Sequence, residues 1–215
     1  FWRKLEHPKT CNGVNIIIRY TLRLLSAQQF ERATKLILAC EFIRQNNTEL
    51  GNNPISIGFW IGSSSIPNVI KGDHGAEAKL KKLMTKFLNK TYKPNYDVNP
   101  FQLSNCQWCN TKIISRLQPN DTSYHIGHRI NKHLQSFCLS ESCNFSEKKG
   151  GLPIVLVDED VYAKPPTILF ATVDKFAMLA WKPEATSLFN YNNNRKPELI
   201  IQDELHLLNG TLGSL

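Results

Sequence analysis

Short apolar segments recur along the chain, and the first of them is followed directly by a stretch with helical periodicity. Residues 14–18 (VNIII) are apolar apart from Asn15 and rich in isoleucine, which predicts a buried strand. Residues 21–44 carry apolar side chains at helical spacing, and Thr21 is a suitable N-cap. A strand, a turn and a helix in this order begin an open α/β unit, so we predict an α/β fold. Further strands are predicted at residues 55–61, 154–157, 167–171 and 199–201.

Length and composition exclude several classes of protein. A chain of 215 residues fits one large domain, or one domain with an insertion. Its 41% hydrophobic and 20% charged residues exclude a disordered chain. No run approaches the roughly 18 apolar residues of a membrane span, and no apolar segment of a signal peptide follows the basic start. We therefore expect a cytoplasmic protein without a membrane segment.

Charge is distributed unevenly along the chain. Residues 1–150 contain 21 Lys and Arg against 10 Asp and Glu, whereas residues 151–215 contain 5 against 8. The basic charge of residues 1–150 favours binding to polyanions, although a basic surface that only faces solvent explains it equally well. The acidic residues among 151–215 suit a divalent cation. An amphipathic helix is predicted at residues 75–90, and its lysines are interpreted as a solvated face rather than a binding site. Its expected apolar face consists of Ala76, Leu80, Leu83, Met84, Phe87 and Leu88.

Residues 96–150 differ from the rest of the chain in composition and periodicity, because they contain four cysteines and no long run of apolar residues at regular spacing. Cys106 and Cys109 form a C-x₂-C pair, and Cys138 and Cys143 follow at a looser C-x₄-C spacing. Two such pairs supply the four ligands of a tetrahedral zinc ion, which can fold a segment with few apolar residues. Nothing else in this segment is expected to form a core, so we predict a structural zinc site in an insertion.

Three other arrangements of this segment stay open. The cysteines could form disulfides, or they could be reduced and unligated. In a mixed site, His125 or His128 would replace Cys138 or Cys143 as a ligand. The more natural expectation is that the three histidines of the segment lie on a basic surface with Arg129 and Lys132.

The sharpest feature of the sequence is an apolar strand, residues 199–201, that ends in two carboxylates. Asp203 and Glu204 would lie at the carboxyl edge of a sheet, where open α/β folds bind ligands. In a nucleotide hydrolase the aspartate holds Mg²⁺ and the glutamate polarises the attacking water. An Asp-Glu pair also begins many helices, so a capping role is the alternative.

Several motifs together narrow the interpretation. Asp203, Glu204 and His206 have the form of a DExH box, and Thr21 to Gln28 follows a strand as motif Ia does in superfamily-two helicases. Residues 170–177 (FATVDKFA) are similar to the T-P-[DE]-[KR] motif, with valine in place of the commoner proline. The chain resembles the DrmA-type helicase of DISARM anti-phage defence systems. The resemblance is carried by residues 170–177 together with residues 19–33, residues 58–62 (GFWIG), the C-x-W-C knuckle and residues 200–214.

This resemblance implies a partial RecA-like parallel-sheet motor domain that carries a small zinc-ribbon-like insertion. It implies ATP-driven translocation on DNA, in complex with other defence-system proteins in a bacterial or archaeal cytoplasm. Asp203 and Glu204 would then act on Mg²⁺, ATP and water, and His206 would couple the nucleotide site to the nucleic acid. Arg23, Thr172 and Lys175 would contact the DNA backbone, where cationic groups neutralise charge without reading sequence. Tyr20 and Trp60 are expected to be core residues rather than base-stacking ones.

The chain contains no G-x-x-x-x-G-K-[ST] loop, which motors of this kind use to hold the β- and γ-phosphates. We therefore expect an internal fragment of a longer helicase that does not hydrolyse ATP by itself. Its expected parts are residues 1–95 and 151–215 of the motor domain and residues 96–150 of the insertion.

Two other functions are compatible with the sequence. A zinc-dependent nucleic-acid-binding module without catalysis would explain the basic charge and the cysteines. A metal-dependent nuclease that uses Asp203, Glu204 and His206 together with the histidines of residues 96–150 is the weaker alternative, since those histidines lie in a different segment.

Overall fold

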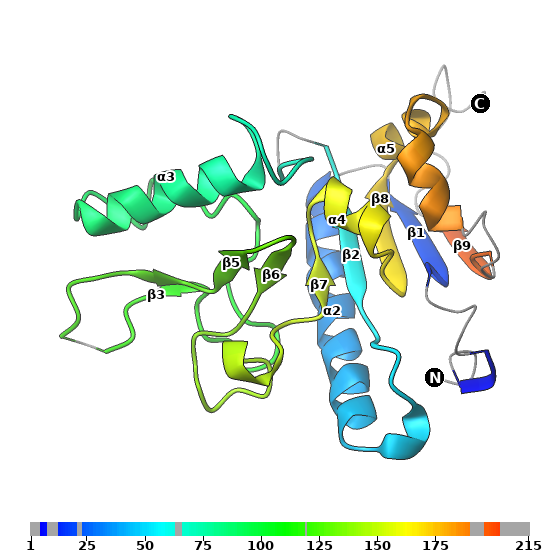
Figure 1. Cartoon of the computed structure of the whole chain (residues 1–215), viewed down its shortest axis with the longest axis horizontal. Coiled ribbons are helices and arrows are strands. Elements are labelled where there is room, and N and C mark those ends of the chain that lie inside the picture. Colours follow the sequence, from blue (N-terminus) through cyan, green and yellow to red (C-terminus); the bar gives the residue numbers. More distant parts are fainter. Residues whose placement is uncertain are drawn as a thin grey trace.

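The computed structural model describes residues 5–7, 13–20, 23–62, 66–118, 120–189 and 196–202, and of residues 23–28 and 180 it describes the backbone only. Its main body is a five-stranded sheet in which all paired strands are parallel, in the order β7-β2-β8-β1-β9 (Figure 1). This confirms the prediction of an α/β fold. The strands are β1 (Ile16–Tyr20), β2 (Ile57–Trp60), β7 (Ile154–Val155), β8 (Ile168–Thr172) and β9 (Leu199–Gln202).

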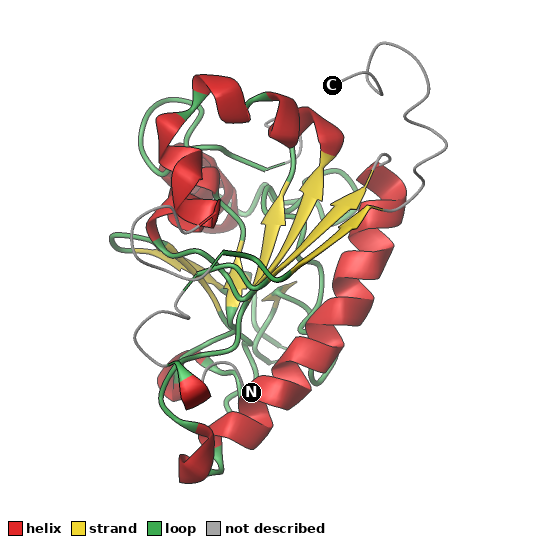
Figure 2. Ribbon diagram, turned by 90° about the vertical axis from the view of Figure 1, so that its right-hand side faces the viewer, coloured by secondary structure: helices red, strands yellow, loops and turns green. Residues whose placement is uncertain are grey.

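The side chains of β1, β2, β7 and β8 alternate between two hydrophobic clusters, one on each face of the sheet. Helix α2 (Arg23–Gln45) lies along one face of the sheet (Figure 2), where Phe30 stacks on Phe59 at 4.4 Å between ring centroids. The other face buries Trp60 and Leu169 against two short helices, α4 (Asp158–Ala163) and the 3₁₀ helix η4 (Pro183–Phe189). Strands with both faces buried must be apolar throughout, which explains why short apolar runs predicted β1, β2 and β8 well.

The predicted strand at residues 154–157 is shorter than expected. Only β7, its first two residues, pairs in the sheet, and Val157 already occupies the N-cap position of α4. The three acidic residues that follow it suit the first turn of a helix, because they face its positive end. Tyr20 and Trp60 are buried, as expected of core residues. The predicted N-cap residue Thr21 lies outside the described residues.

The predicted amphipathic helix is present as α3 (Ala76–Leu88), which projects away from the sheet (Figure 1). Its expected apolar face is only partly correct. Met84 is 49% exposed and Leu88 is 81% exposed, so both lie on the solvent side of the helix. The helix packs along one side only, which leaves the edges of its apolar stripe uncovered. The residues that it does bury are Ala76, Leu80, Leu83 and Phe87.

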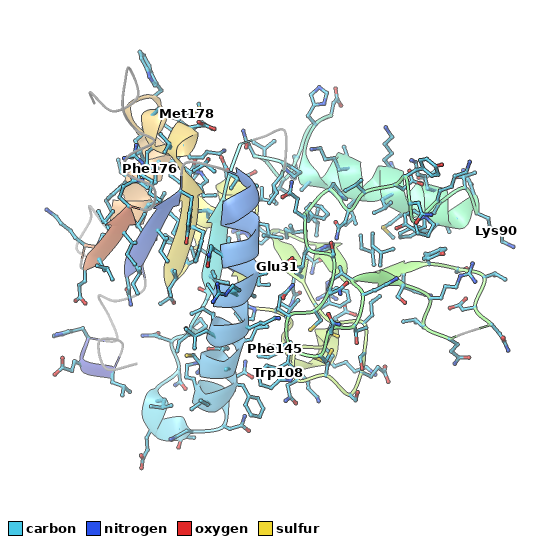
Figure 3. The ribbon with its side chains drawn as sticks, turned by 180° about the vertical axis from the view of Figure 1, so that it is seen from behind. Glu31, Lys90, Trp108, Phe145, Phe176 and Met178 are labelled. Atoms are coloured by element: carbon cyan, nitrogen blue, oxygen red, sulfur yellow. The ribbon has the colours of Figure 1, made fainter. Side chains whose placement is uncertain are left out.

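Residues 96–150 form two small antiparallel hairpins and several turns between α3 and the sheet. The expectation that they lack a core is wrong, because Phe101, Ile113 and Phe145 are fully buried there. Trp108 lies between Phe145 and Phe42 of α2, so the insertion packs directly on the α/β body (Figure 3 labels Trp108 and Phe145). Its elements are β3 (Ile114–Ser115), β4 (His125–Ile126), β5 (His128–Ile130), β6 (Leu134–Ser136) and the 3₁₀ helix η2 (Glu147–Lys149).

Three further short helices complete the described fold. They are the 3₁₀ helix η1 (Thr48–Leu50), α5 (Val173–Ala177) and the 3₁₀ helix η3 (Leu179–Trp181). Among the helices that the structure describes, none combines the length and the apolar character needed to cross a membrane.

Candidate functional site

The first cysteine pair lies on a tight turn that aims both thiols to the same side. The backbone N–H of Cys106 donates to the carbonyl oxygen of Thr111 at 2.7 Å, and Asn110 N–H donates back to the Cys106 carbonyl at 2.8 Å. Asn110 has a φ of 62°, a left-handed conformation that asparagine adopts more readily than most residues. The Sγ of Cys109 lies 3.2 Å from the Thr111 hydroxyl.

The second pair is shaped by a similar turn, in which backbone groups point at sulfur. The N–H of Ser140 donates to Cys138 Sγ, and the N–H of Phe145 donates to Cys143 Sγ, both at 3.4 Å. Cys138 N–H donates to the Phe145 carbonyl at 2.9 Å, which closes the turn. Amide groups directed at sulfur stabilise thiolates, the form in which cysteine binds metals.

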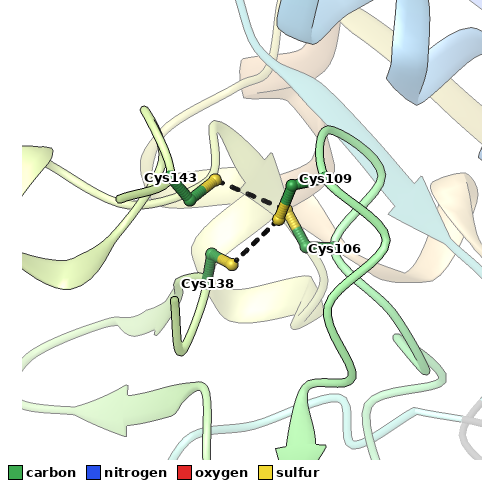
Figure 4. A group of neighbouring side chains, drawn as sticks. All are labelled: Cys106, Cys109, Cys138 and Cys143. Carbon is green, nitrogen blue, oxygen red and sulfur yellow. Dashed lines mark hydrogen bonds between the residues drawn. The ribbon is translucent and has the colours of Figure 1, made fainter. Parts of the chain in front are cut away.

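The two turns bring all four sulfur atoms together (Figure 4). Cys106 Sγ lies 3.9 Å from Cys143 Sγ, and Cys109 Sγ lies 3.4 Å from Cys138 Sγ. All four atoms lie within 4.8 Å of one another. A tetrahedral zinc ion with Zn–S bonds of about 2.3 Å separates its sulfur ligands by about 3.8 Å. The four cysteines can therefore hold a metal ion such as zinc.

Protonation of the thiols also bears on metal binding. Burial raises the pKa of Cys106 to about 11 and raises that of Cys138 further. Burial acts in the same direction on Cys109, but hydrogen bonds from Thr111 and from Cys138 bring its pKa down to about 7. Buried thiols of this kind need a cation to ionise at neutral pH, and a bound divalent metal supplies that charge.

The histidines do not join this cluster among the described residues. His128 is buried, with Nδ1 3.0 Å from the Ser136 hydroxyl and Nε2 3.2 Å from Asn99 Nδ2. His125 Nε2 lies 3.3 Å from a carboxylate oxygen of Asp121. The mixed cysteine–histidine arrangement is therefore not supported, and the expectation of a surface histidine cluster is wrong for His128. The reason is that His128 fills a polar niche in the core of the insertion.

The other predicted site residues belong to the carboxyl edge of the parallel sheet. Thr172 ends β8 and is buried, and its hydroxyl has no hydrogen-bond partner among the described residues. Arg23 begins α2, but its side chain is not described. Gln202 is the last described residue of β9, so Asp203, Glu204 and His206 lie outside the described residues.

Lys175, on α5 directly after β8, is buried rather than open to solvent. Its ammonium donates to Asp158 Oδ2 at 2.5 Å and to Asn68 Oδ1 at 3.0 Å. Burial lowers the pKa of Lys175 and raises the pKa of Asp158, while the attraction between the two groups opposes both shifts. This environment favours an ion pair that braces the edge of the sheet over a direct contact between Lys175 and phosphate.

Sequence reasoning missed the three consecutive acidic residues at the start of α4, which bind three different parts of the molecule. Asp158 binds Lys175, and Glu159 accepts the Ile70 N–H at 2.8 Å. Asp160 accepts hydrogen bonds from His133 Nδ1 at 2.6 Å and from the backbone N–H of Leu134 at 2.8 Å. The signal was present as an acidic run directly after an apolar segment, but its partners are distant in sequence.

Comparison with known proteins gives an informative relative. No family model matches the chain. The DISARM protein DrmA of Bacillus paralicheniformis is 36% identical to this chain over an alignment 237 positions long, which covers 94% of this chain. The chain spans only 20% of the length of that relative. Over nearly its whole length, the chain is therefore related to part of a DISARM protein DrmA.

Proposed function

We propose that the chain forms part of an ATP-dependent DNA helicase or translocase that acts in anti-phage defence together with other defence-system proteins. The relationship to a DISARM protein DrmA supports the defence role. The motor activity is proposed from the sequence motifs and from where their strands lie in the sheet. ATP and Mg²⁺ are the cofactors that this activity requires.

The observation that carries the proposal is the register of three neighbouring strands. Tyr20 of β1 pairs with Thr172 of β8, and Arg19 of β1 pairs with Gln202 of β9. Each of these strands therefore ends at the same edge, and in the sequence one of the three helicase-like motifs begins at the last residue of each strand or directly after it. Ligands of open parallel sheets bind at this edge.

The proposed roles follow from the chemistry of the residues. Asp203 would hold Mg²⁺ through its water shell, Glu204 would polarise the water that attacks the γ-phosphate, and His206 would couple this site to DNA. Arg23 would contact the DNA backbone, and the buried hydroxyl of Thr172 would do so only where the edge of the sheet opens to admit it. Lys175 would join them only by leaving the buried pair with Asp158, which makes a bracing role the better assignment.

The exposed apolar side chains of β9, the edge strand of the sheet, support the proposal that the motor includes more than this chain. Leu199, Ile200 and Ile201 are all exposed, although central strands bury such side chains. Exposed apolar edge strands favour association, so proteins normally cover or pair them. We infer that further parts of a longer protein cover β9 and supply the phosphate-binding loop.

The four cysteines complete the proposal as a structural zinc site. Their mutual distances fit a zinc ion, and Trp108, next to Cys109 in sequence, packs on α2. In this role zinc would fix the turns of the insertion and would take no part in ATP hydrolysis.

The test is DNA-stimulated ATP hydrolysis by a longer protein that contains this chain. Glu204→Gln removes the proposed water-polarising carboxylate and is expected to lower turnover at least about a hundredfold. Glu31→Gln, an exposed residue on α2, is the matched control and is expected to leave turnover unchanged.

Each other outcome points to a different function. DNA binding without ATP turnover in the unmodified protein would replace the motor with a zinc-dependent nucleic-acid-binding module. Cleavage of DNA with Mg²⁺ and without ATP would indicate a nuclease. Equal turnover in the Glu204→Gln protein and the unmodified protein would contradict the proposed role of Glu204.

A further inference from the structure

The end of α3 and the part of the insertion next to it form a shallow hollow far from the sheet, which we call the tip. It is built from the last turn of α3, the segment at residues 90–96, and the connection between β3 and β4. Figure 3 shows Lys90 at this outer end of the molecule. The hollow has a volume of about 640 Å³ and is lined by aromatic, basic and small polar side chains.

Three aromatic rings hold the tip together, and a fourth is open to solvent. Phe87 packs edge-on against Tyr92 at 4.9 Å, and Tyr92 packs on Tyr124 at 4.7 Å between ring centroids. Tyr96 also lines the hollow but is 81% exposed, so its ring faces solvent. A large exposed aromatic ring beside a hollow offers a flat apolar surface to a ligand.

The charge of the hollow is positive. Lys90, Lys93 and Arg116 line it and are exposed, and the guanidinium of Arg116 lies 5.1 Å from the centre of the Tyr124 ring. Asp121 is the acidic residue of the lining, and its carboxylate already contacts His125.

A second acidic residue lies next to the hollow and is also engaged. The carboxylate of Asp97 forms an ion pair with Lys86 and accepts the backbone N–H of Lys93 at 2.7 Å. The charge of Lys93 also acts on Asp97, but among the described residues the ion-pair partners of the two carboxylates are Lys86 and His125. The exposed side chains of Lys90, Lys93 and Arg116 can therefore reach a ligand outside the chain.

We propose that the tip binds a single-stranded nucleic acid, with a base stacked on Tyr96 and phosphates held by Lys90, Lys93 and Arg116. Aromatic rings beside basic groups are the chemistry by which proteins bind single strands without reading sequence. A duplex keeps its bases stacked inside, so the Tyr96 ring could not reach them. The inference deepens the proposed function, on which it rests, by adding a strand contact remote from the edge of the sheet.

The first test measures binding of a fluorescent oligothymidylate of about 15 nucleotides to the intact chain by anisotropy. Tyr96→Ala is expected to weaken binding about tenfold, because one base no longer stacks on the protein. Trp181→Ala is the matched control, since Trp181 is an aromatic residue of η3 that is equally exposed at 82% and should leave affinity unchanged. Unchanged affinity in the Tyr96→Ala protein would overturn the proposal.

The second test addresses the phosphates. Reversing the charge of Lys93 and Arg116 to glutamate is expected to reduce the slope of log affinity against log salt by about 0.7 for each phosphate that is no longer neutralised. Lys164→Glu, an exposed lysine between α4 and β8, is the control. An equal reduction in binding to polyglutamate would show a general anion-binding surface, and would overturn the assignment to nucleic acid.

A third measurement locates the strand without any variant. Photocrosslinking with an oligonucleotide that carries 5-iodouracil should modify Tyr96, and crosslinks confined to other segments would contradict the proposal. None of these experiments needs ATP. Strand binding at the tip can therefore be tested even if the protein does not hydrolyse ATP. In the same way, the Glu204→Gln comparison still tests the motor if the tip does not bind a strand.

Discussion

The buried ammonium of Lys175 donates a hydrogen bond to Asp158 and so joins the helix after β8 to the first turn of α4. Asn68 accepts a second hydrogen bond from the same ammonium. Trp60 donates its indole N–H to the Tyr162 hydroxyl at 3.1 Å, and that hydroxyl lies 3.5 Å from the Asp158 carboxylate. The buried ion pair and the neighbouring hydrogen bonds thus connect the carboxyl ends of β2, β7 and β8; of these strands, β8 carries the proposed DNA contact Thr172.

Breaking this pair should destabilise the fold strongly. Asp158→Asn leaves the Lys175 ammonium buried without a countercharge, and Lys175→Met does the same to the carboxylate, so each change should cost about 3–5 kcal/mol. The double variant should be more stable than the sum of the two losses predicts, by about 1–3 kcal/mol. Urea unfolding of the four proteins measures this coupling, and additive losses would show that the pair is not formed.

The same double variant separates two roles of Lys175. It removes both charges together, so no buried charge is left to unfold the edge of the sheet. If Lys175 contacts phosphate, the double variant binds DNA more weakly and with a smaller salt slope than the unmodified chain. If Lys175 only braces the fold, DNA binding is unchanged, which is the outcome that its burial leads us to expect.

The elements that the sequence predicts well are those whose own residues determine them. β1 and β8 have both faces buried, so an unbroken apolar run is sufficient to identify each strand. The cysteine cluster was also predictable, because each pair is local and zinc geometry requires two pairs. Strand ends were less accurate: β1 extends two residues beyond the predicted segment, since Tyr20 still pairs with Thr172.

The features that sequence reasoning missed depend on distant partners. Nothing near Asp160 in the sequence indicates that it accepts hydrogen bonds from His133 and from the backbone of Leu134. The core of the insertion was missed for the same reason, because Phe101 and Phe145 lie in irregular segments without periodicity. Residues of this kind are brought together by the fold and not by spacing along the chain.

Removing one cysteine should remove the proposed zinc. Cys106→Ser is expected to lower the zinc content from about one per chain to near zero, because three thiolates bind this ion more weakly than four. Stability should fall as well, by about 4 kcal/mol where free zinc exceeds its Kd about a thousandfold. Cys40→Ser is the control, since Cys40 lies outside the cluster. Zinc-free unmodified protein, purified reduced and without chelator, would contradict the site.

Gly127, between β4 and β5, should tolerate no side chain. A Cβ at this position would lie 2.1 Å from the carbonyl oxygen of Phe137, the residue before Cys138. Backbone hydrogen bonds hold both segments in place, since Phe137 N–H donates to the Gly127 carbonyl at 2.8 Å. Gly127→Ala should therefore destabilise the chain by about 1–3 kcal/mol and weaken zinc retention. Thr122→Ala, in the exposed loop between β3 and β4, should do neither; chemical denaturation and metal analysis compare the two variants.

His128 should make the chain less stable in mild acid. Burial lowers its pKa to about 3, and its ring packs on Phe101 with centroids 4.7 Å apart. In the unfolded chain a histidine binds a proton near pH 6.5, whereas the folded chain excludes that proton until about pH 3. The unfolded state therefore binds more protons in this window, so stability falls as the pH drops from about 6.5 toward 3.

Between pH 7 and pH 5 this single group should cost about 2 kcal/mol of unfolding free energy. Acid also releases metal from thiolates, so the comparison is between the unmodified chain and His128→Gln, which share all four cysteines. The introduced glutamine would keep a polar side chain in the niche without a titrating group, so the stability of this variant should fall less over the same range. Urea unfolding at several pH values measures the difference. Parallel pH profiles would mean that His128 already binds a proton in the folded chain, and that its contacts with Ser136 and Asn99 do not require the neutral ring.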